Sequence, residues 1–338
     1  MLALRYGEVM RKSLLFFTSV AIALLFGCAQ AAETSDTSIW NDFKLGGYSS
    51  AGFNVHPGGR VDGALDEISL ILSWENNSSF RFFSELELER PITFNKGHSA
   101  EKDFYFDLER LYVDYNLSEK ANLRAGRFLN PVGRWNTLHA APLVWTASRP
   151  LATSRLFPMY NNGLMFYGAV PLTNNALEYN LYIEALKDQH EDKGEIVFRD
   201  TKGARFAWLG KFNIGLSLLE FREKLPNNAE FHLLGLDFLV HQNGWEFSGE
   251  AFQRYTNQYG DGGNGAYLQA VAPLGHQWFA IARAESFKRP AEGSSERWLL
   301  GTAWRMTPHK VLKIEYVDGD EERLGSPRGL LASFAILF

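Results

Sequence analysis

Acidic and basic side chains fall at every second position in several stretches of this chain. In the clearest stretch, Glu85, Glu87 and Glu89 alternate with Leu86 and Leu88. Side chains of a β-strand point alternately to its two faces, so the three carboxylates would share one face and the leucines the other. Charged residues at equivalent positions elsewhere are Arg81, Arg124, Glu178, Arg205, Glu246, Glu250, Arg283 and Arg305. So many charges cannot lie in a dry core, because a buried unpaired charge is costly. We therefore expect this face to line a water-filled channel.

The segment 133–163 carries the second set of candidate residues. It is the longest predicted connection, it is rich in basic and apolar side chains, and it has no acidic residue. An apolar segment of this length is functional more often than disordered, so we expect it to fold inward. Opposed charges at a narrow point set ion selectivity in pores. The predicted pore constriction consists of Arg134, Arg149, Arg155, Glu85, Glu87 and Glu89. The alternative for each arginine is a structural bond to carbonyl groups of the loop.

An enzyme is the alternative from another class, and the histidines argue against it. They are scattered at 56, 98, 139, 190, 232, 241, 276 and 309, without a serine motif that would complete a hydrolytic site. His232 would face inward only if the strand register were shifted by one residue. No two histidines have metal-ligand spacing, and Asp261 to Gly265 lacks the full calcium-loop pattern. We expect no catalytic residues, no metal and no cofactor.

The elements that position these residues are strands. From Phe43 onward, runs of about 7–13 residues keep a period of two. The first three are 43–55, 64–75 and 80–90, and we expect about sixteen in all. The later runs centre on Leu111, Leu123, Phe166, Leu181, Phe206, Leu216, Leu236, Phe247, Leu268, Ala282, Leu300, Ile314 and Phe334.

The connections between these runs alternate in length. The short ones are 76–79, 117–120, 171–175, 210–213, 242–244, 273–277 and 307–310. The long ones include 91–103, 133–163, 187–202, 256–265, 288–296 and 319–329. Short turns on one side and long loops on the other predict an all-β fold, a transmembrane antiparallel β-barrel of about 16 strands (14 to 18) with an inward-folded third loop. We place the short turns in the periplasm and the loop 187–202 outside. A soluble β-sandwich or solenoid is the alternative fold.

Aromatic residues and the chain end support the barrel. Trp74, Trp208, Trp245, Trp278 and Trp304 flank the predicted short turns, as does Tyr115, which fits a ring of aromatics at a membrane–water boundary. The final alternation from Leu330 to Phe338 puts apolar residues on one face up to the last residue. A strand of this kind must pair with the first one, because an open edge in lipid leaves backbone groups unsatisfied.

The N-terminus predicts secretion. Arg11 and Lys12 precede an apolar run, and Ala29 to Ala31 form a cleavage pattern, so residues 1–31 read as a cleaved signal peptide and 32–338 as one outer-membrane barrel domain. Met10 is an alternative start of the chain. The single cysteine, Cys28, makes a lipoprotein-type cleavage the alternative to cleavage after Ala31. The mean hydropathy of −0.21 excludes a bundle of membrane helices. The net charge of −5, which becomes more negative after cleavage, argues against a nucleic-acid partner.

With the strand pattern and the loop, the chain resembles Gram-negative outer-membrane porins. The stretch 123–133, LRAGRFLNPVG, is similar to the strand that enters the constriction loop in the phosphate-selective porin O/P-like group. The resemblance implies a bacterial outer-membrane location, passive diffusion of small ions or hydrophilic solutes, and often a homotrimer. Phe338 resembles the signal read by the barrel-assembly machinery. Anion-selective members of this group carry a row of basic residues through the lumen. This chain has a row of acidic residues there, so the resemblance does not imply selectivity for phosphate. A non-conducting barrel that acts as a binding or structural shell, or less so a barrel enzyme, remains the alternative.

Overall fold

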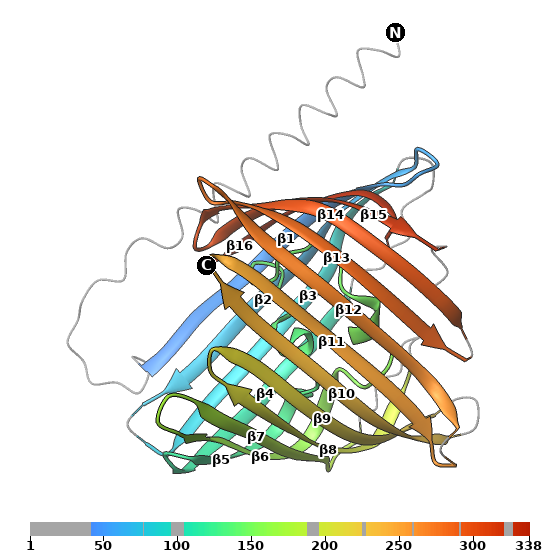
Figure 1. The fold of residues 1–338 in the computed structure, drawn as a ribbon. Coiled ribbons are helices and arrows are strands. Elements are labelled where there is room, and N and C mark those ends of the chain that lie inside the picture. The colour runs from blue at the N-terminus through green and yellow to red at the C-terminus, as the bar shows by residue number, and fades with distance from the viewer. Residues whose placement is uncertain are drawn as a thin grey trace, which may run out of the picture. The chain divides into compact units, whose positions relative to one another are not determined.

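The chain forms a closed antiparallel barrel of sixteen strands (Figure 1). This computed structural model describes residues 42–338 except 77, 96–104, 188–195, 225–227, 259, 291 and 321–326. Each strand pairs with its neighbours in sequence, and β16 pairs with β1 to close the sheet. The predicted signal peptide and the second possible start lie outside the described residues, as does Cys28.

The strands are long and evenly distributed along the chain. Their bounds are β1 (Phe43–Val55), β2 (Val61–Glu75), β3 (Phe80–Asn95), β4 (Tyr105–Ser118), β5 (Ala121–Leu129), β6 (Tyr160–Pro171), β7 (Ala176–Glu184), β8 (Phe198–Leu209), β9 (Phe212–Glu223), β10 (Ala229–Gln242), β11 (Trp245–Thr256), β12 (Asp261–Gly275), β13 (Trp278–Arg289), β14 (Gly293–Thr307), β15 (Lys310–Gly319) and β16 (Gly329–Leu337). Two short helices lie between β5 and β6: the α-helix α2 (Trp135–Leu138) and the 3₁₀-helix η2 (Leu151–Thr153). No helix of the described part is long and apolar enough to cross a membrane.

The structure confirms the strand count and corrects the lengths of the long loops. Every predicted strand centre lies in a strand, and each predicted short connection contains a turn. Several strands run further than predicted into the long connections, as β3 does to Asn95 and β8 from Phe198. The outer end of β8 carries polar residues on both faces, so its alternation stops before the backbone pairing does, whereas β3 still presents Ile92 and Phe94 on one face. The central part of the predicted loop 187–202 lies outside the described residues.

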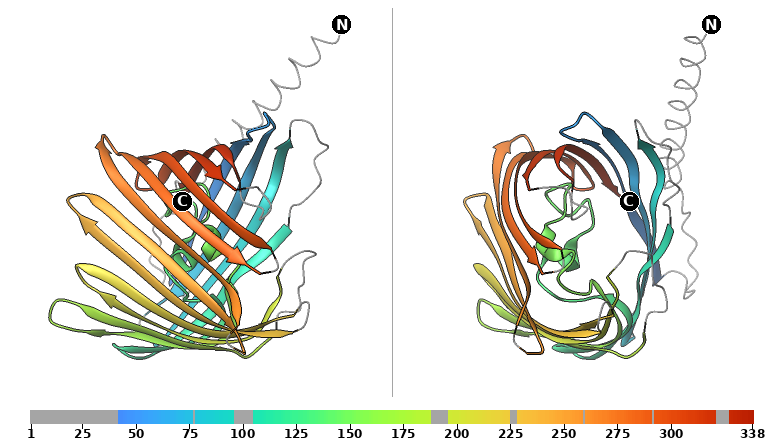
Figure 2. Two further views of the ribbon diagram at one scale, coloured as in Figure 1. Left: turned by 45° about the vertical axis from the view of Figure 1, so that its right-hand side comes forward. Right: turned by 90° about the vertical axis from the view of Figure 1, so that its right-hand side faces the viewer.

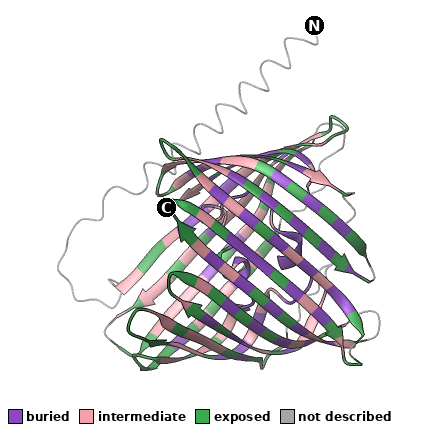
Figure 3. Cartoon of the chain, viewed as in Figure 1, coloured by how far each residue is buried: buried purple, intermediate pink, exposed green. Residues whose placement is uncertain are grey.

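The outer face of the barrel is apolar at mid-strand. Buried and exposed residues alternate along the strands (Figure 3). Exposed outward residues at mid-strand include Leu70, Leu86, Leu181, Leu216, Leu236, Leu268, Leu300 and Phe334. Near the short turns the indole rings of Trp278 and Trp304 stack with centroids 5.3 Å apart, and Phe80 packs against Tyr115 at 4.9 Å. These rings form the predicted aromatic boundary.

The last residue takes part in closing the barrel. Phe338 donates its backbone N–H to the carbonyl oxygen of Gly47 (2.9 Å), and its own carbonyl oxygen accepts from the Gly47 N–H (2.8 Å). A side chain at Gly47 would overlap the Phe338 ring, so this glycine lets the two strands meet. The chain end is therefore paired, as predicted from its alternation.

The connection between β5 and β6 folds into the barrel, which confirms the predicted inward third loop. We call residues 130–159 the inner loop; in the right-hand view of Figure 2 it lies inside the ring of strands. Its apolar residues Val132, Leu151, Leu156 and Phe157 are buried against inward-facing residues of β5–β7, β9–β11 and β13. Trp145 packs against a second apolar cluster on β12–β16. The apolar composition of the loop thus has a physical cause: the loop supplies part of the interior of the barrel.

Candidate functional site

The inner loop is attached first to β11. Glu250 lies buried on this strand, and its Oε1 accepts hydrogen bonds from the backbone N–H groups of Arg134 (3.1 Å) and Trp135 (2.7 Å). Tyr267 donates its hydroxyl to the same oxygen at 2.8 Å. The carboxylate therefore satisfies the free N–H groups at the start of α2, where negative charge is favoured. Gly133 adopts a positive φ of 64° beside this carboxylate, and any side chain there would overlap it.

A second set of anchors lies on β13–β15. Glu315 accepts the backbone N–H groups of Ala147 and Ser148 at 2.9 and 2.8 Å, and Glu285 accepts that of Leu151 at 2.7 Å. Cationic anchors donate to loop oxygens: Arg283 to Thr146 and Ser148, Lys313 to Ala141 and Thr146, and Arg305 to Pro142 and Leu143. Trp145 donates its indole N–H to Glu246 at 2.9 Å. Four residues predicted to line the lumen, Glu246, Glu250, Arg283 and Arg305, do face inward, but they hold the loop.

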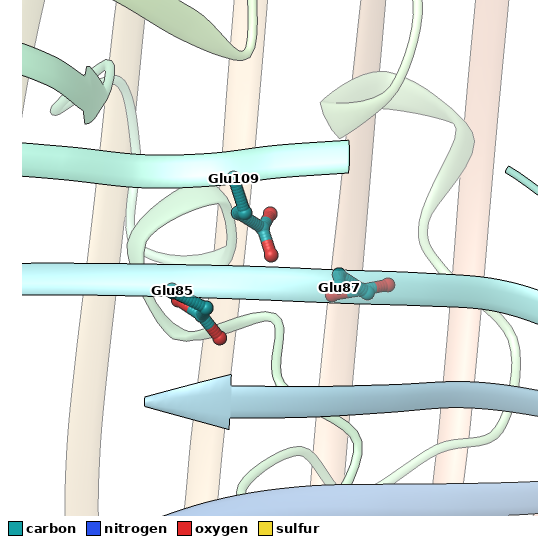
Figure 4. Close-up of side chains that lie close together, drawn as sticks. All are labelled: Glu85, Glu87 and Glu109. Atoms are coloured by element: carbon teal, nitrogen blue, oxygen red, sulfur yellow. The ribbon is translucent and has the colours of Figure 1, made fainter. Parts of the chain in front are cut away.

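The predicted acidic row is present on β3 and gains a member from β4. One carboxylate oxygen each of Glu85, Glu87 and Glu109 lies within 4.8 Å of the others, and all three side chains are buried (Figure 4). Arg110 forms an ion pair with Glu85, which also accepts the Ser69 hydroxyl at 2.8 Å. Glu89, the predicted third member of the row, does not belong to this cluster. It accepts a hydrogen bond from the Tyr105 hydroxyl at 2.6 Å.

Helix α2 lies between β11 and the cluster of Glu85, Glu87 and Glu109 on β3 and β4, which we call the acidic wall together with the acidic residues of β2. His139, which follows the helix, places its Nε2 2.8 Å from Oε1 of Glu109 on β4. In the strand order, β4 and β11 lie on nearly opposite sides of the barrel. Glu250 holds one end of the helix and Glu109 the other, so the loop crosses the lumen. We assign no metal to the carboxylates, because protein groups already contact each of them.

The three loop arginines do not form a row opposite the glutamates. Arg149 donates to the side chain of Asn136 (3.0 Å) and to the carbonyl oxygen of Thr153 (2.9 Å), and its burial lowers the pKa of the guanidinium below its ordinary value. Arg155 pairs with Glu292 at 2.9 Å. Arg134 contacts Glu250 through its backbone. For Arg149 the alternative interpretation is therefore correct: it forms structural hydrogen bonds within the loop.

The remaining predicted lumen residues lie on the wall formed by β3–β8. Arg124 forms a bidentate pair with Asp114 at 2.7 and 2.9 Å, and its guanidinium lies 3.6 Å from the ring centre of Tyr112. Arg81 donates to Asn122 and retains 37% exposure of its side chain. The last two have different surroundings: Arg205 pairs with Asp237 in a buried site, and Glu178 is half-buried.

Sequence reasoning missed Glu109 for a physical reason. Simple alternation along β4 puts Arg110 inward and Glu109 toward the lipid. A β-bulge shifts the register between the Glu85–Arg110 and Leu86–Leu108 pairs, so both charged residues reach the interior. Two adjacent charges within a membrane-crossing strand were the available signal, since one of them would otherwise face hydrocarbon. His232 does lie on the outward face, close to Glu220 and Glu230, as the predicted register requires.

Comparisons with known proteins agree on the fold. No family model matches the chain. An uncharacterized protein of Aquifex aeolicus (strain VF5) is 32% identical over 143 residues, which cover 41% of this chain and only 31% of that protein's length. Among solved structures, Salmonella typhi OmpF in complex with daunomycin aligns with a TM-score of 0.61 at 13% identity, covering 89% of this chain and 99% of OmpF.

Two other solved structures resemble the chain to a similar degree. OmpT of Vibrio cholerae gives a TM-score of 0.59 at 7% identity, and the outer membrane channel DcaP of Acinetobacter baumannii gives 0.57 at 10% identity. In both cases 88% of this chain and 97% of the other are covered. At these identities the likeness shows a shared fold, that of outer-membrane barrels. With its apolar outer belt, the chain is a bacterial outer-membrane protein.

Proposed function

We propose that the chain is a porin, a water-filled channel for passive diffusion of small ions and hydrophilic solutes. The single observation that carries the proposal is the contrast between the two faces of the barrel. The outer face is apolar, while ionic groups on the inner wall remain in contact with solvent. Side chains of Arg81, Arg110 and Asp107 are 37%, 24% and 28% exposed. Charged groups with this exposure inside a closed barrel imply water along β3–β5.

We further propose that the passage favours cations. Acidic residues outnumber basic ones on the inner faces of β2–β4, at the level that the inner loop crosses. The acidic residues are Asp66, Glu67, Glu85, Glu87, Glu89 and Glu109, and Arg110 is the cation that pairs with this group. Glu85, Glu87 and Glu89 form the cation-attracting side of the proposed constriction, and Arg134, Arg149 and Arg155 contribute positive charge from separate places on the inner loop. Kinship with the phosphate-selective group rests on the stretch 123–133, and the acidic wall argues against phosphate as the solute.

Two partners belong to the same proposal. Phe338 ends the strand that closes the barrel, and we propose that the barrel-assembly machinery reads this end. We also propose a homotrimer in the membrane. The outer faces of β12 and β13 support it, because they present Ala266, Ala270, Ala280, Ala282 and Ala284, whose small side chains allow close approach of a second barrel.

A liposome-swelling assay tests the channel directly. Purified full-length protein should make vesicles swell in isotonic solutions of small sugars, and more slowly in solutions of large oligosaccharides. Vesicles that contain folded, heat-modifiable protein and do not swell in any of these solutions would overturn the proposal.

A non-conducting shell is the second candidate, and one observation favours it. The inner loop buries Val132, Leu151, Leu156 and Phe157 in an apolar cluster that reaches across much of the barrel. If that packing seals the lumen, the barrel would serve as a binding or structural shell. The swelling assay separates the two candidates, because a sealed barrel admits no sugar of any size.

A further inference from the structure

The attachment of the inner loop to Glu109 on β4 is made by one histidine. Helix α2 starts at Glu250 on β11 and is followed by His139, which contacts Glu109 on β4. The helix has only four residues, Trp135–Leu138. A helix this short has little stability of its own. Its position across the lumen therefore depends on what holds each end.

Both nitrogens of the His139 ring face oxygen acceptors. Nδ1 lies 2.9 Å from the carbonyl oxygen of Asn136, and Nε2 lies 2.8 Å from Oε1 of Glu109. Tyr160 donates its hydroxyl to the same Oε1 at 3.1 Å. A neutral imidazole has one N–H and can satisfy only one of its two contacts, whereas the imidazolium satisfies both. Only the imidazolium can therefore make both contacts together, and the charged pair makes the bridge to Glu109 a strong hydrogen bond.

The surroundings suit a cation at this point. The charged and titratable groups around His139 and Glu109 are Tyr48 on β1, Glu67 on β2, Glu85 and Glu87 on β3, Arg110 on β4, Tyr160 on β6 and Arg149 of the inner loop. Carboxylates predominate among them. A neutral His139 can donate to Glu109 or to the carbonyl oxygen of Asn136 but not to both, and it loses the charge attraction to the carboxylate.

We propose that His139 positions the inner loop across the lumen, and that its proton-dependent bridge to Glu109 sets the width of the passage. The inference rests on the proposed channel function. Histidine side chains change charge between about pH 5 and pH 8. The bridge is therefore strongest when His139 is protonated and weaker when the ring is neutral, and we expect the passage to widen in the neutral state.

Single-channel recording in planar bilayers between about pH 5 and pH 8 tests the proposal. Wild-type conductance should rise as the pH increases. His139→Ala should give the high conductance at every pH, and His139→Arg, which keeps a positive charge, should give the low conductance at every pH. The control His232→Ala changes a histidine near two glutamates on the outer face and should keep the wild-type profile.

Two results would overturn the inference: a flat wild-type profile, or a pH-dependent rise that persists in both His139 variants. If His139→Ala does not assemble, His139→Arg alone must abolish the rise of conductance with pH. A wild-type chain that inserts without conducting contradicts the proposed function instead. The bridge is then judged by chymotrypsin cleavage of the inner loop, which should increase with pH in wild type relative to His139→Arg, and equal cleavage of the two would refute it.

Discussion

Glu250 shows how a charge inside the barrel can stabilise a loop rather than line water. Its carboxylate accepts two backbone N–H groups and the hydroxyl of Tyr267, and Gly133 makes room for it. Each buried donor left without an acceptor costs about 1–3 kcal/mol. The charged residues of the lumen thus have two roles. Those on β11 and β13–β15 anchor the inner loop, and those on β2–β4 form the acidic wall.

Glu250→Ala should loosen the inner loop without opening the barrel. The backbone N–H groups of Arg134 and Trp135 would lose their acceptor, so the start of α2 would detach from β11. We expect trypsin to cleave after Arg134 or Arg155 in the variant but not in wild type, while heat-modifiable migration on gels is unchanged. Glu178→Ala, which removes a half-buried acid on β7, is the matched control. Equal protease resistance in all three proteins would contradict the anchor role.

At the scale of elements, period-two alternation predicted the strands well because a lipid-facing residue cannot be polar at mid-strand. It failed in two places where that constraint is absent. Beyond the belt, β8 begins with polar residues on both faces. At Glu109 the bulge changes which residues face inward. The inward fold of the third loop followed from its apolar composition, but its partners depend on contacts between residues far apart in sequence, such as Trp135 with Glu250, which one sequence cannot reveal.

The closing strand gives a prediction about assembly. Phe338 pairs with Gly47 through both backbone groups, and its ring packs beside this glycine. Phe338→Asp should lower the yield of heat-modifiable, membrane-inserted protein, because a charge at the chain end disfavours both closure and the proposed recognition by the assembly machinery. Leu274→Asp changes an exposed apolar residue next to a short turn at the same rim and serves as the control. Equal yields for the two variants would mean that Phe338 has no special role.

At the scale of the whole molecule, the alternation of short and long connections fixes an orientation. The short turns should lie in the periplasm, as in outer-membrane barrels generally. Cysteine placed at Asn243, in a short turn, should resist a membrane-impermeant thiol reagent in intact cells. Cysteine at Gln258, in the connection between β11 and β12, should react. Labelling of Asn243→Cys with protection of Gln258→Cys would reverse the topology.

The last prediction follows from the charge distribution of the whole barrel. Glu85, Glu87 and Glu109 of the acidic wall are buried, but their charge should act on ions that pass the inner loop, since water screens charges over a Debye length of about 8 Å at physiological salt. Replacing Glu85, Glu87 and Glu89 together with glutamine should shift the reversal potential toward anions. Replacing Arg134, Arg149 and Arg155 with glutamine should shift it toward cations, by less, because Arg149 and Arg155 are engaged in contacts of the loop. Both shifts should shrink in molar salt.

The most direct measurement of the central claim is the reversal potential of the purified wild-type protein in a planar bilayer under a salt gradient. A porin with this lumen should give discrete conductance steps and a reversal potential on the cation-selective side. Protein that inserts without conducting, or that conducts with a preference for anions, would contradict the account.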